Sequence, residues 1–276
     1  MNSHPKGMIA LVISATLYGL FGVFSREIGF QVPFFYQQWI RNLFTLVMLV
    51  IAIFITKSWK KINSSDYKWF FLQNLCGFIS FVGIYLGFIY LDFSTNYFIS
   101  YATSTIGGYI AGNILFGEKL DRKKVWSLIL AIIGVYLTYQ AVFSFTILPY
   151  LLISAVGGLA TAGWFAFSKK ISNIYSNLQI NVVGSVFMTI LSFMISILRS
   201  EQWLFPIFNK VWIMIFLFGI FFLLNSFLII YGFSKVEVQK GSLIMLLDIV
   251  AGIFFGYLFY AEKITGIQMI GGLLIL

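Results

Sequence analysis

The sequence predicts an all-α membrane protein with ten transmembrane helices, arranged as two inverted five-helix repeats. Three observations support this prediction: an apolar composition, a series of long apolar segments, and residue patterns that recur in both halves. Of the 276 residues, 60% are hydrophobic and only 10% are charged, whereas a soluble domain carries about 25% charged residues. One globular core cannot bury so much apolar surface, so a large part of it must face lipid.

Ten apolar segments are expected to cross the membrane, which takes about 20 residues for each helix. The first five lie at 7–25, 33–55, 67–91, 94–116 and 125–143, and the second five at 147–168, 178–198, 211–233, 241–260 and 266–276. The last segment has only 11 residues and would extend about 16 Å at a rise of about 1.5 Å per residue. It is too short to cross alone, so we expect the natural chain to continue beyond it.

The basic residues between these segments predict the orientation of the chain. Cytoplasmic loops of membrane proteins are enriched in lysine and arginine. With the N-terminus inside, Arg41 lies within a segment, only Arg26, Arg199, Lys210 and Lys263 lie outside, and the other thirteen basic residues lie inside. We therefore predict a multi-pass protein of the cytoplasmic membrane with a cytoplasmic N-terminus. The net charge of +9 then reflects topology and not nucleic-acid binding.

Short patterns recur in both halves of the chain at an almost constant distance. The sequence Phe-Ser-Arg-Glu-Ile at 24–28 matches Phe-Ser-Lys-Lys-Ile at 167–171, 143 positions later. A Gly-xxx-Gly pattern followed by a glutamate, at Gly108, Gly112 and Glu118, matches Gly252, Gly256 and Glu262, 144 positions later. Because each half has an odd number of segments, the second half (145–276) should enter the membrane from the side opposite to the first (1–144). Inverted repeats are typical of secondary transporters.

The two Gly-xxx-Gly patterns predict close helix packing, because glycine lets two backbones approach each other. Their matching positions indicate equivalent close crossings by the fourth and ninth helices. Glu118 and Glu262 follow these helices beside lysines. They are therefore interpreted as helix caps or gate contacts and not as carboxylates that bind the transported molecule.

On these residues the chain resembles the EamA-type transporters of the drug/metabolite transporter superfamily. The resemblance covers nearly the whole chain and includes Tyr18-Gly19, Arg41 and glycine-rich fifth and tenth segments. The chain departs from the family where Leu-Glu-Pro is common, since it has Leu247-Asp248-Ile249. The resemblance implies a secondary transporter that moves a small metabolite, such as an amino acid or a related compound, across the cytoplasmic membrane by alternating access, often as an exporter.

Two ionisable side chains, Arg41 and Asp248, fall deep within predicted segments. A charge at the bilayer centre costs about 2.5–3.5 kcal/mol on insertion scales, so such residues face the bundle interior or a water-filled cavity. There they bind substrate, carry a proton or form a structural ion pair with each other. Asp248 is the only carboxylate inside a segment, so we predict that it is the functional centre.

Five further side chains are candidates for contact with the substrate. Tyr18, Tyr101 and Trp164 lie in the first, fourth and sixth segments, which line the cavity in the resembled family, and aromatic rings can bind cations. One residue in five is aromatic, so packing is the alternative role of these rings. Asn74 and Asn225 lie at roughly matching places in the third and eighth segments. Each amide needs a hydrogen-bond partner there, either on another helix or on the substrate.

Other classes of protein fit the sequence less well. A single histidine and a single cysteine argue against a multi-ligand metal site or a disulfide framework, and no cofactor is expected. An intramembrane protease would need a buried Ser–His or Asp–Asp arrangement, but no histidine and only one aspartate lie within segments. An exporter or flippase of a toxic cation or a lipid-linked sugar, a channel and a non-transporting membrane protein are the remaining alternatives. A channel should show a ring of polar ligands, which we do not find.

Overall fold

The computed structural model describes residues 3–28, 31–140 and 145–276, and in this part of the chain every regular element is helical. The first half contains α1 (Ser3–Tyr18), α2 (Phe21–Ile28), α3 (Phe34–Thr56), the 3-10 helix η1 (Ser64–Asp66), α4 (Tyr67–Tyr90), α5 (Phe93–Phe116) and α6 (Arg122–Tyr139). The second half contains the 3-10 helix η2 (Phe145–Ile147), α7 (Leu148–Ser172), α8 (Asn177–Leu198), α9 (Lys210–Lys235), α10 (Val238–Met245), α11 (Leu247–Tyr260) and α12 (Gly266–Ile275). The predicted all-α fold is confirmed.

Seven helical stretches of the described chain are long and apolar enough to cross a membrane. They are His4–Ile28, Phe34–Thr56, Ser64–Tyr90, Phe145–Ser172, Asn177–Leu198, Lys210–Lys235 and Val238–Tyr260. The other three predicted segments are also helical where they are described. However, α5 is rich in serine, threonine and glycine, α6 begins with three basic residues, and α12 has only 10 residues. Large apolar side chains such as Phe54, Ile114 and Leu198 are more than 70% exposed, as lipid-facing residues are.

Two of the predicted segments are broken helices, although neither contains a proline. The first segment breaks into α1 and α2 at Gly19 and Leu20, and the ninth breaks into α10 and α11 at Leu246. Gly19 packs directly on α11, because a Cβ atom there would lie 2.7 Å from both the Cβ of Ala251 and the backbone nitrogen of Gly252. The break in the first segment therefore lies against α11, close to the break in the ninth.

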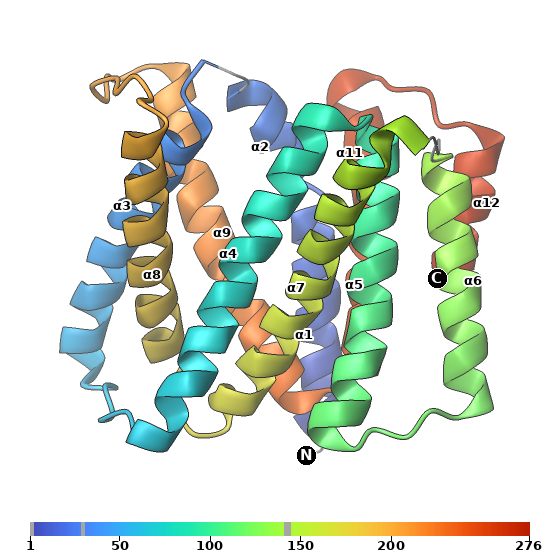
Figure 1. The fold of residues 1–276 in the computed structure, drawn as a ribbon, viewed down its shortest axis with the longest axis horizontal. Coiled ribbons are helices and arrows are strands. Elements are labelled where there is room, and N and C mark those ends of the chain that lie inside the picture. Colours follow the sequence, from blue (N-terminus) through green and yellow to red (C-terminus); the bar gives the residue numbers. More distant parts are fainter. Residues whose placement is uncertain (1–2, 29–30, 141–144) are drawn as a thin grey trace.

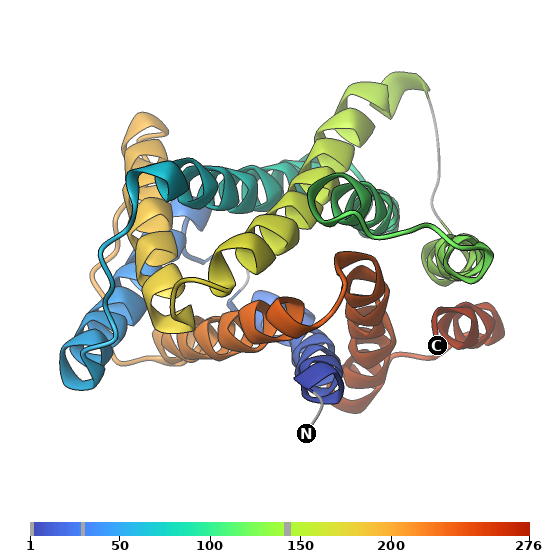
Figure 2. The ribbon, with the colours of Figure 1, turned by 90° about the horizontal axis from the view of Figure 1, so that it is seen from below.

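The two halves interlock and do not form two separate bundles. In Figure 1 all the long helices run between two ends of the molecule, where the connecting loops gather. From the first half, α4 and α5 pack on α7, and from the second half, α9, α10 and α11 pack on α1. The pair α3–α8 lies at one edge, and the pair α6–α12 lies at the other edge in both views (Figures 1 and 2).

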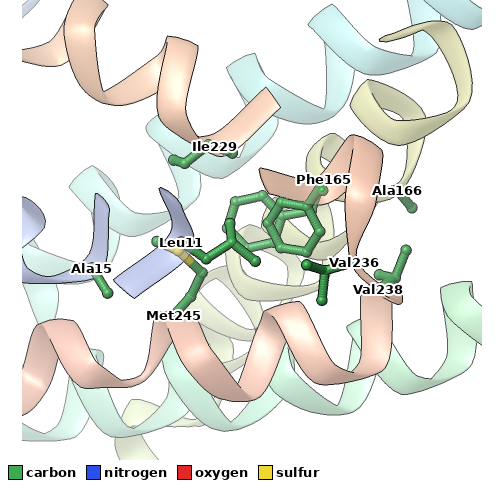
Figure 3. Close-up of a cluster of buried hydrophobic side chains, with 9 residues drawn as sticks. Leu11, Ala15, Phe165, Ala166, Ile229, Val236, Val238 and Met245 are labelled. Carbon is green, nitrogen blue, oxygen red and sulfur yellow. The ribbon is translucent and has the colours of Figure 1, made fainter. Parts of the chain in front are cut away.

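A buried apolar cluster holds α1, α7, α9 and α10 together (Figure 3). Leu11 of α1 and Met245 of α10 both belong to it, and the rings of Phe165 and Phe233 stack with centroids 4.5 Å apart. Leu11 and Met245 precede the breaks in their helices. The cluster thus packs α1 and α10 together over the parts of these helices that precede the two breaks.

Candidate functional site

Asp248 lies in the first turn of α11, directly after the helix break, and is only 9% exposed. Its Oδ2 accepts a hydrogen bond of 2.8 Å from the hydroxyl of Tyr101. Its Oδ1 is buried and has no hydrogen-bond partner among the described residues. The partial positive charge at a helix start favours a carboxylate, but a buried acceptor without a donor is costly. One oxygen of Asp248 is therefore available to a donor on a ligand.

Three tyrosine rings lie beside Asp248. Tyr97 and Tyr101 are one turn apart on α5, and Tyr139 ends α6. The ring centroids lie 5.4 to 6.3 Å apart, and the planes are parallel within 16°. All three hydroxyls are close enough to Asp248 to interact with it electrostatically. Of these three tyrosines only Tyr101 was predicted from the sequence. The i, i+4 spacing of Tyr97 and Tyr101 is a signal that could have placed both on one helix face.

Arg41 is the buried basic residue of α3, with 6% of its surface exposed. Its guanidinium lies 4.2 Å from the ring centroid of Phe218 and donates a hydrogen bond to the Gln38 side chain. In the described chain, no ion pair involves Arg41 or Asp248. A structural ion pair between these two residues is therefore not formed. Tyr18, the last residue of α1, is close enough to both Asp248 and Arg41 to interact with them electrostatically. Both ionisable side chains therefore lie near the break in the first segment.

The other three candidate residues have packing contacts. Trp164 contacts Gly77 of α4 and the ring of Phe165. Asn225 is fully buried and accepts a 2.5 Å hydrogen bond from Ser14 of α1. No hydrogen bond or ring contact joins Trp164 or either asparagine to the charged pair in the part of the chain that the structure describes.

The two asparagines do not occupy equivalent places. Asn74 donates to the carbonyl oxygen of Phe70 in its own helix at 2.8 Å, and its Oδ1 faces Gly184 of α8. Asn225 instead faces α1. If Asn74 were the repeat counterpart of Asn225, it would face α7, which is the counterpart of α1. The expected match between Asn74 and Asn225 is therefore wrong.

A largely buried ion pair lies at the C-terminal end of α5. Glu118 Oε1 lies 3.0 Å from Nζ of Lys169, and this ammonium lies 4.8 Å from the ring centroid of Phe116. The Glu118 carboxylate also accepts the backbone N–H groups of Val238 at 2.7 Å and Gln239 at 3.0 Å, at the start of α10. These five residues are called the Glu118 cluster below. They join the ends of α5 and α7 to the beginning of α10.

A second ion pair, also with its basic side chain over an aromatic ring, lies at the end of α11. Glu262 pairs with Arg26 at 2.5 Å, and the Arg26 guanidinium lies 4.7 Å from the ring centroid of Tyr260. Glu262 and Tyr260 stand 144 positions after their counterparts, and Arg26 stands 143 positions before its own. The side chains of this Glu262 cluster are about half exposed, at 55% for Arg26 and 48% for Glu262, against 15% for Lys169 and 6% for Glu118.

The second glycine of each Gly-xxx-Gly pattern lies against the glutamate side chain of one of these clusters. A Cβ at Gly112 would come within 2.4 Å of Glu118 Oε2, and one at Gly256 within 2.5 Å of Glu262 Oε2. Each glutamate N–H also bonds the carbonyl of the same glycine, at 3.0 and 3.4 Å respectively, after a left-handed residue. The first pattern makes the predicted close crossing, because a Cβ at Gly108 would lie 2.7 Å from the Cβ of Ser242 and a Cβ at Gly112 would lie 2.9 Å from Cγ of Gln239, both on α10. The second pattern does not make an equally close crossing, since a Cβ at Gly252 would lie 3.9 Å from the carbonyl oxygen of Gly19 and a Cβ at Gly256 would meet Glu262.

A close crossing that is equivalent in the two halves lies one residue before the first glycine of each pattern. A Cβ at Gly107 would lie 2.8 Å from the Cβ of Ala162, and a Cβ at Gly19 would lie 2.7 Å from that of Ala251. Ala251 is 144 positions after Gly107, and Ala162 is 143 positions after Gly19. In one crossing the first half supplies the glycine from α5, and in the other it supplies the glycine from the break in the first segment. The repeat counterpart of each glycine is an alanine, so both crossings keep one glycine–alanine contact.

Comparison with known proteins agrees with this arrangement. The EamA-like transporter family matches residues 5–140 and, a second time, residues 148–276. An uncharacterized transporter of Archaeoglobus fulgidus is 29% identical over 168 residues, which cover 59% of this chain and 58% of that protein. The match therefore spans little more than half the length of this curated relative.

A solved crystal structure has the same fold, with a TM-score of 0.83 at 14% identity, and the alignment covers 98% of this chain and 95% of the other. The family match extends over both halves, and the helices are long and apolar enough for a multi-pass membrane protein. The chain belongs to the EamA-like transporter family, within the drug/metabolite transporter superfamily.

Proposed function

We propose that this transporter moves a small zwitterionic metabolite, such as an amino acid or a related compound, across the cytoplasmic membrane. The observation that carries the proposal is the presence of two buried, opposite and mutually unpaired charges near Tyr18. Breaking a buried ion pair costs about 3–5 kcal/mol, so unpaired buried charges require another partner. A molecule with both an ammonium and a carboxylate group supplies both partners at once.

Each end of the substrate has a suitable group to meet. Oδ1 of Asp248 lacks a donor and can accept an N–H bond from the ammonium. Arg41 uses a guanidinium N–H on Gln38 and retains further donors for a carboxylate, which this group binds in a fork geometry. The tyrosine rings beside Asp248 offer faces to a cation or to a flat side chain. Export is the direction that the family resemblance implies.

The transport cycle is alternating access between two inverted five-helix repeats, residues 1–144 and 145–276. The matched crossings and the matched glutamate clusters support this relation. The connection after α5 and the connection after α11 lie at opposite ends of the molecule (Figure 1). One cluster therefore belongs to each membrane face, and each must open in its turn. The lysine distribution assigns the Glu118 cluster to the cytoplasmic face and the Glu262 cluster to the outer face.

A ligand screen on the purified protein tests this function. Amino acids, nucleosides, sugars and quaternary amines are each added during thermal unfolding, because a ligand that binds the folded state raises the melting temperature. We expect an amino acid to raise it. Asp248→Asn, which keeps the shape and the Tyr101 contact, and Arg41→Gln should each abolish the effect, whereas Asp92→Asn at an exposed site should not.

Other outcomes separate the alternatives. A quaternary amine that binds in the Arg41→Gln variant but not in Asp248→Asn would favour an exporter of cations. An amino-acid effect that survives both substitutions would contradict the proposed site. Reporter fusions test the topology independently, since an N-terminal fusion that is active outside the cell would contradict the cytoplasmic N-terminus.

A further inference from the structure

A cavity of about 960 Å³ opens at the end of the molecule that carries the Glu118 cluster. It is bounded by the α5–α6 connection, the start of α6, the end of α7 and the α9–α10 turn. Its charged lining consists of Lys119, Lys123, Lys124, Lys169, Lys240, Glu118, Asp121 and Glu237. Five lysines against three carboxylates leave an excess of positive charge, at the opposite end of α5 from Tyr97 and Tyr101.

All three carboxylates are already engaged by the protein. Glu118 binds Lys169 and the start of α10. Asp121 accepts the backbone N–H of Lys124 at 2.8 Å and so caps α6. Glu237 lies 3.1 Å from each of Lys124 and Lys240. None of the three has to leave its present partners for an anion to enter the cavity.

Two lysine side chains of the lining have no partner among the described residues. The ammonium groups of Lys119 and Lys123 are exposed, and neither makes a hydrogen bond or an ion pair in the described parts of the chain. The start of α6, a helix of 18 residues, lies beside them and carries a partial positive charge. Ser127, one turn further along α6, adds a hydroxyl to the same wall. The cavity thus offers free cationic donors and a hydroxyl to an anion.

We propose that this cavity binds the phosphate group of an anionic membrane phospholipid. A lipid is the favoured source of the phosphate because the cavity walls include the end of α7 and the turn between α9 and α10, which belong to stretches long and apolar enough to span a membrane. The cavity should then lie at headgroup level. Basic pockets between transmembrane helices on the cytoplasmic side bind such headgroups. Only the choice of leaflet rests on the proposed topology; the binding chemistry does not depend on transport or on Asp248.

The test measures lipid binding to the full-length chain in detergent. Short-chain phosphatidylglycerol, phosphatidylcholine or inorganic phosphate is titrated during thermal unfolding, and bound lipids are counted by native mass spectrometry. Phosphatidylglycerol should raise the melting temperature, and phosphatidylcholine should not. The double substitution Lys119→Gln/Lys123→Gln should weaken the apparent affinity for phosphatidylglycerol by about tenfold, since each lysine near an anionic surface contributes appreciably.

The matched control is Lys57→Gln/Lys61→Gln, which removes two charges from the connection after α3, at the same end of the molecule (Figure 1). It should bind phosphatidylglycerol like the unmodified protein. An equal loss in both double variants would mean non-specific surface attraction and overturn the proposal. Inorganic phosphate acting as well as the lipid would overturn the choice of lipid. The rise in melting temperature that an amino acid causes should be unchanged in the same variants. The lipid proposal and the transport proposal can therefore fail independently.

Discussion

The Glu118 cluster and the Glu262 cluster are built from the same parts but differ in burial. Each has a glycine that makes room for the glutamate, a left-handed residue before it, and a basic side chain above an aromatic ring. Among the residues that the structure describes, Glu118 also accepts two backbone N–H groups, because α10 begins directly against it, whereas Glu262 accepts none. The repeated pattern specifies the ion pair, whereas the neighbouring helix start determines whether the pair is buried. Under the proposed cycle, the Glu118 pair is the less exposed of the two gate contacts.

The largest expected effect comes from removing one charge of each pair. Glu118→Gln leaves Lys169, which is 15% exposed, with the Val236 carbonyl but without a counter-charge, and breaking a buried pair destabilises by about 3–5 kcal/mol. Glu262→Gln breaks a half-exposed pair, for which about 0–1 kcal/mol is typical. Thermal unfolding in detergent should therefore show a fall of several degrees in melting temperature for the first variant and little change for the second. Equal falls would show that burial does not distinguish the two clusters.

Adding a methyl group next to each glutamate should also change the stability of the protein differently at the two clusters. In Gly112→Ala the new Cβ meets a carboxylate that three groups hold in place, so we expect a loss of about 1–3 kcal/mol from overpacking. In Gly256→Ala the exposed Glu262 can move away. The variant should then be neutral or gain part of the roughly 0.5–1 kcal/mol that alanine gives over glycine within a helix. Melting temperatures that fall alike in both variants would contradict this difference in freedom.

A double-mutant cycle isolates the ion pair from the backbone hydrogen bonds. Lys169→Met alone should destabilise, because it leaves a buried carboxylate without its cation. Glu118→Met/Lys169→Met should lose less than the sum of the two single variants, with a coupling energy of about 1–3 kcal/mol. The corresponding cycle at Arg26 and Glu262 should give a coupling of about 0.5 kcal/mol or less. A larger coupling at the exposed pair would reverse the comparison.

Salt should produce the smallest difference. Ions screen exposed charges at separations of about 8–10 Å at physiological ionic strength, and they screen buried pairs much less. The difference in melting temperature between the unmodified protein and Glu262→Gln should shrink as sodium chloride rises from low to high concentration. The difference for Glu118→Gln should stay constant. A salt-sensitive Glu118 effect would mean that water and ions reach this cluster freely.

The sequence by itself determined the class of fold. A helix that crosses a membrane must be apolar over its whole length, and this property is a sum over neighbouring residues that can be read locally. For the same reason the helix ends were expected within a few residues of their observed positions in most segments. The repeated offset of 143–144 residues likewise led to the correspondence between Glu118 and Glu262. Asp248 and Tyr101 were also named from the sequence, as a charge and an aromatic ring deep within apolar segments.

Only the tertiary structure decided how these residues meet. Tyr97 and Tyr139 were missed because the chain has 15 tyrosines, and their stacking depends on how α5 packs on α6. The break at Leu246 has no proline or glycine beside it, so no local signal preceded it. Whether Arg41 and Asp248 pair, and whether Glu118 is buried, depends on distances between residues far apart in the chain. Hydropathy is local, but such contacts arise from the packing of whole helices, which a single sequence does not encode at any one position.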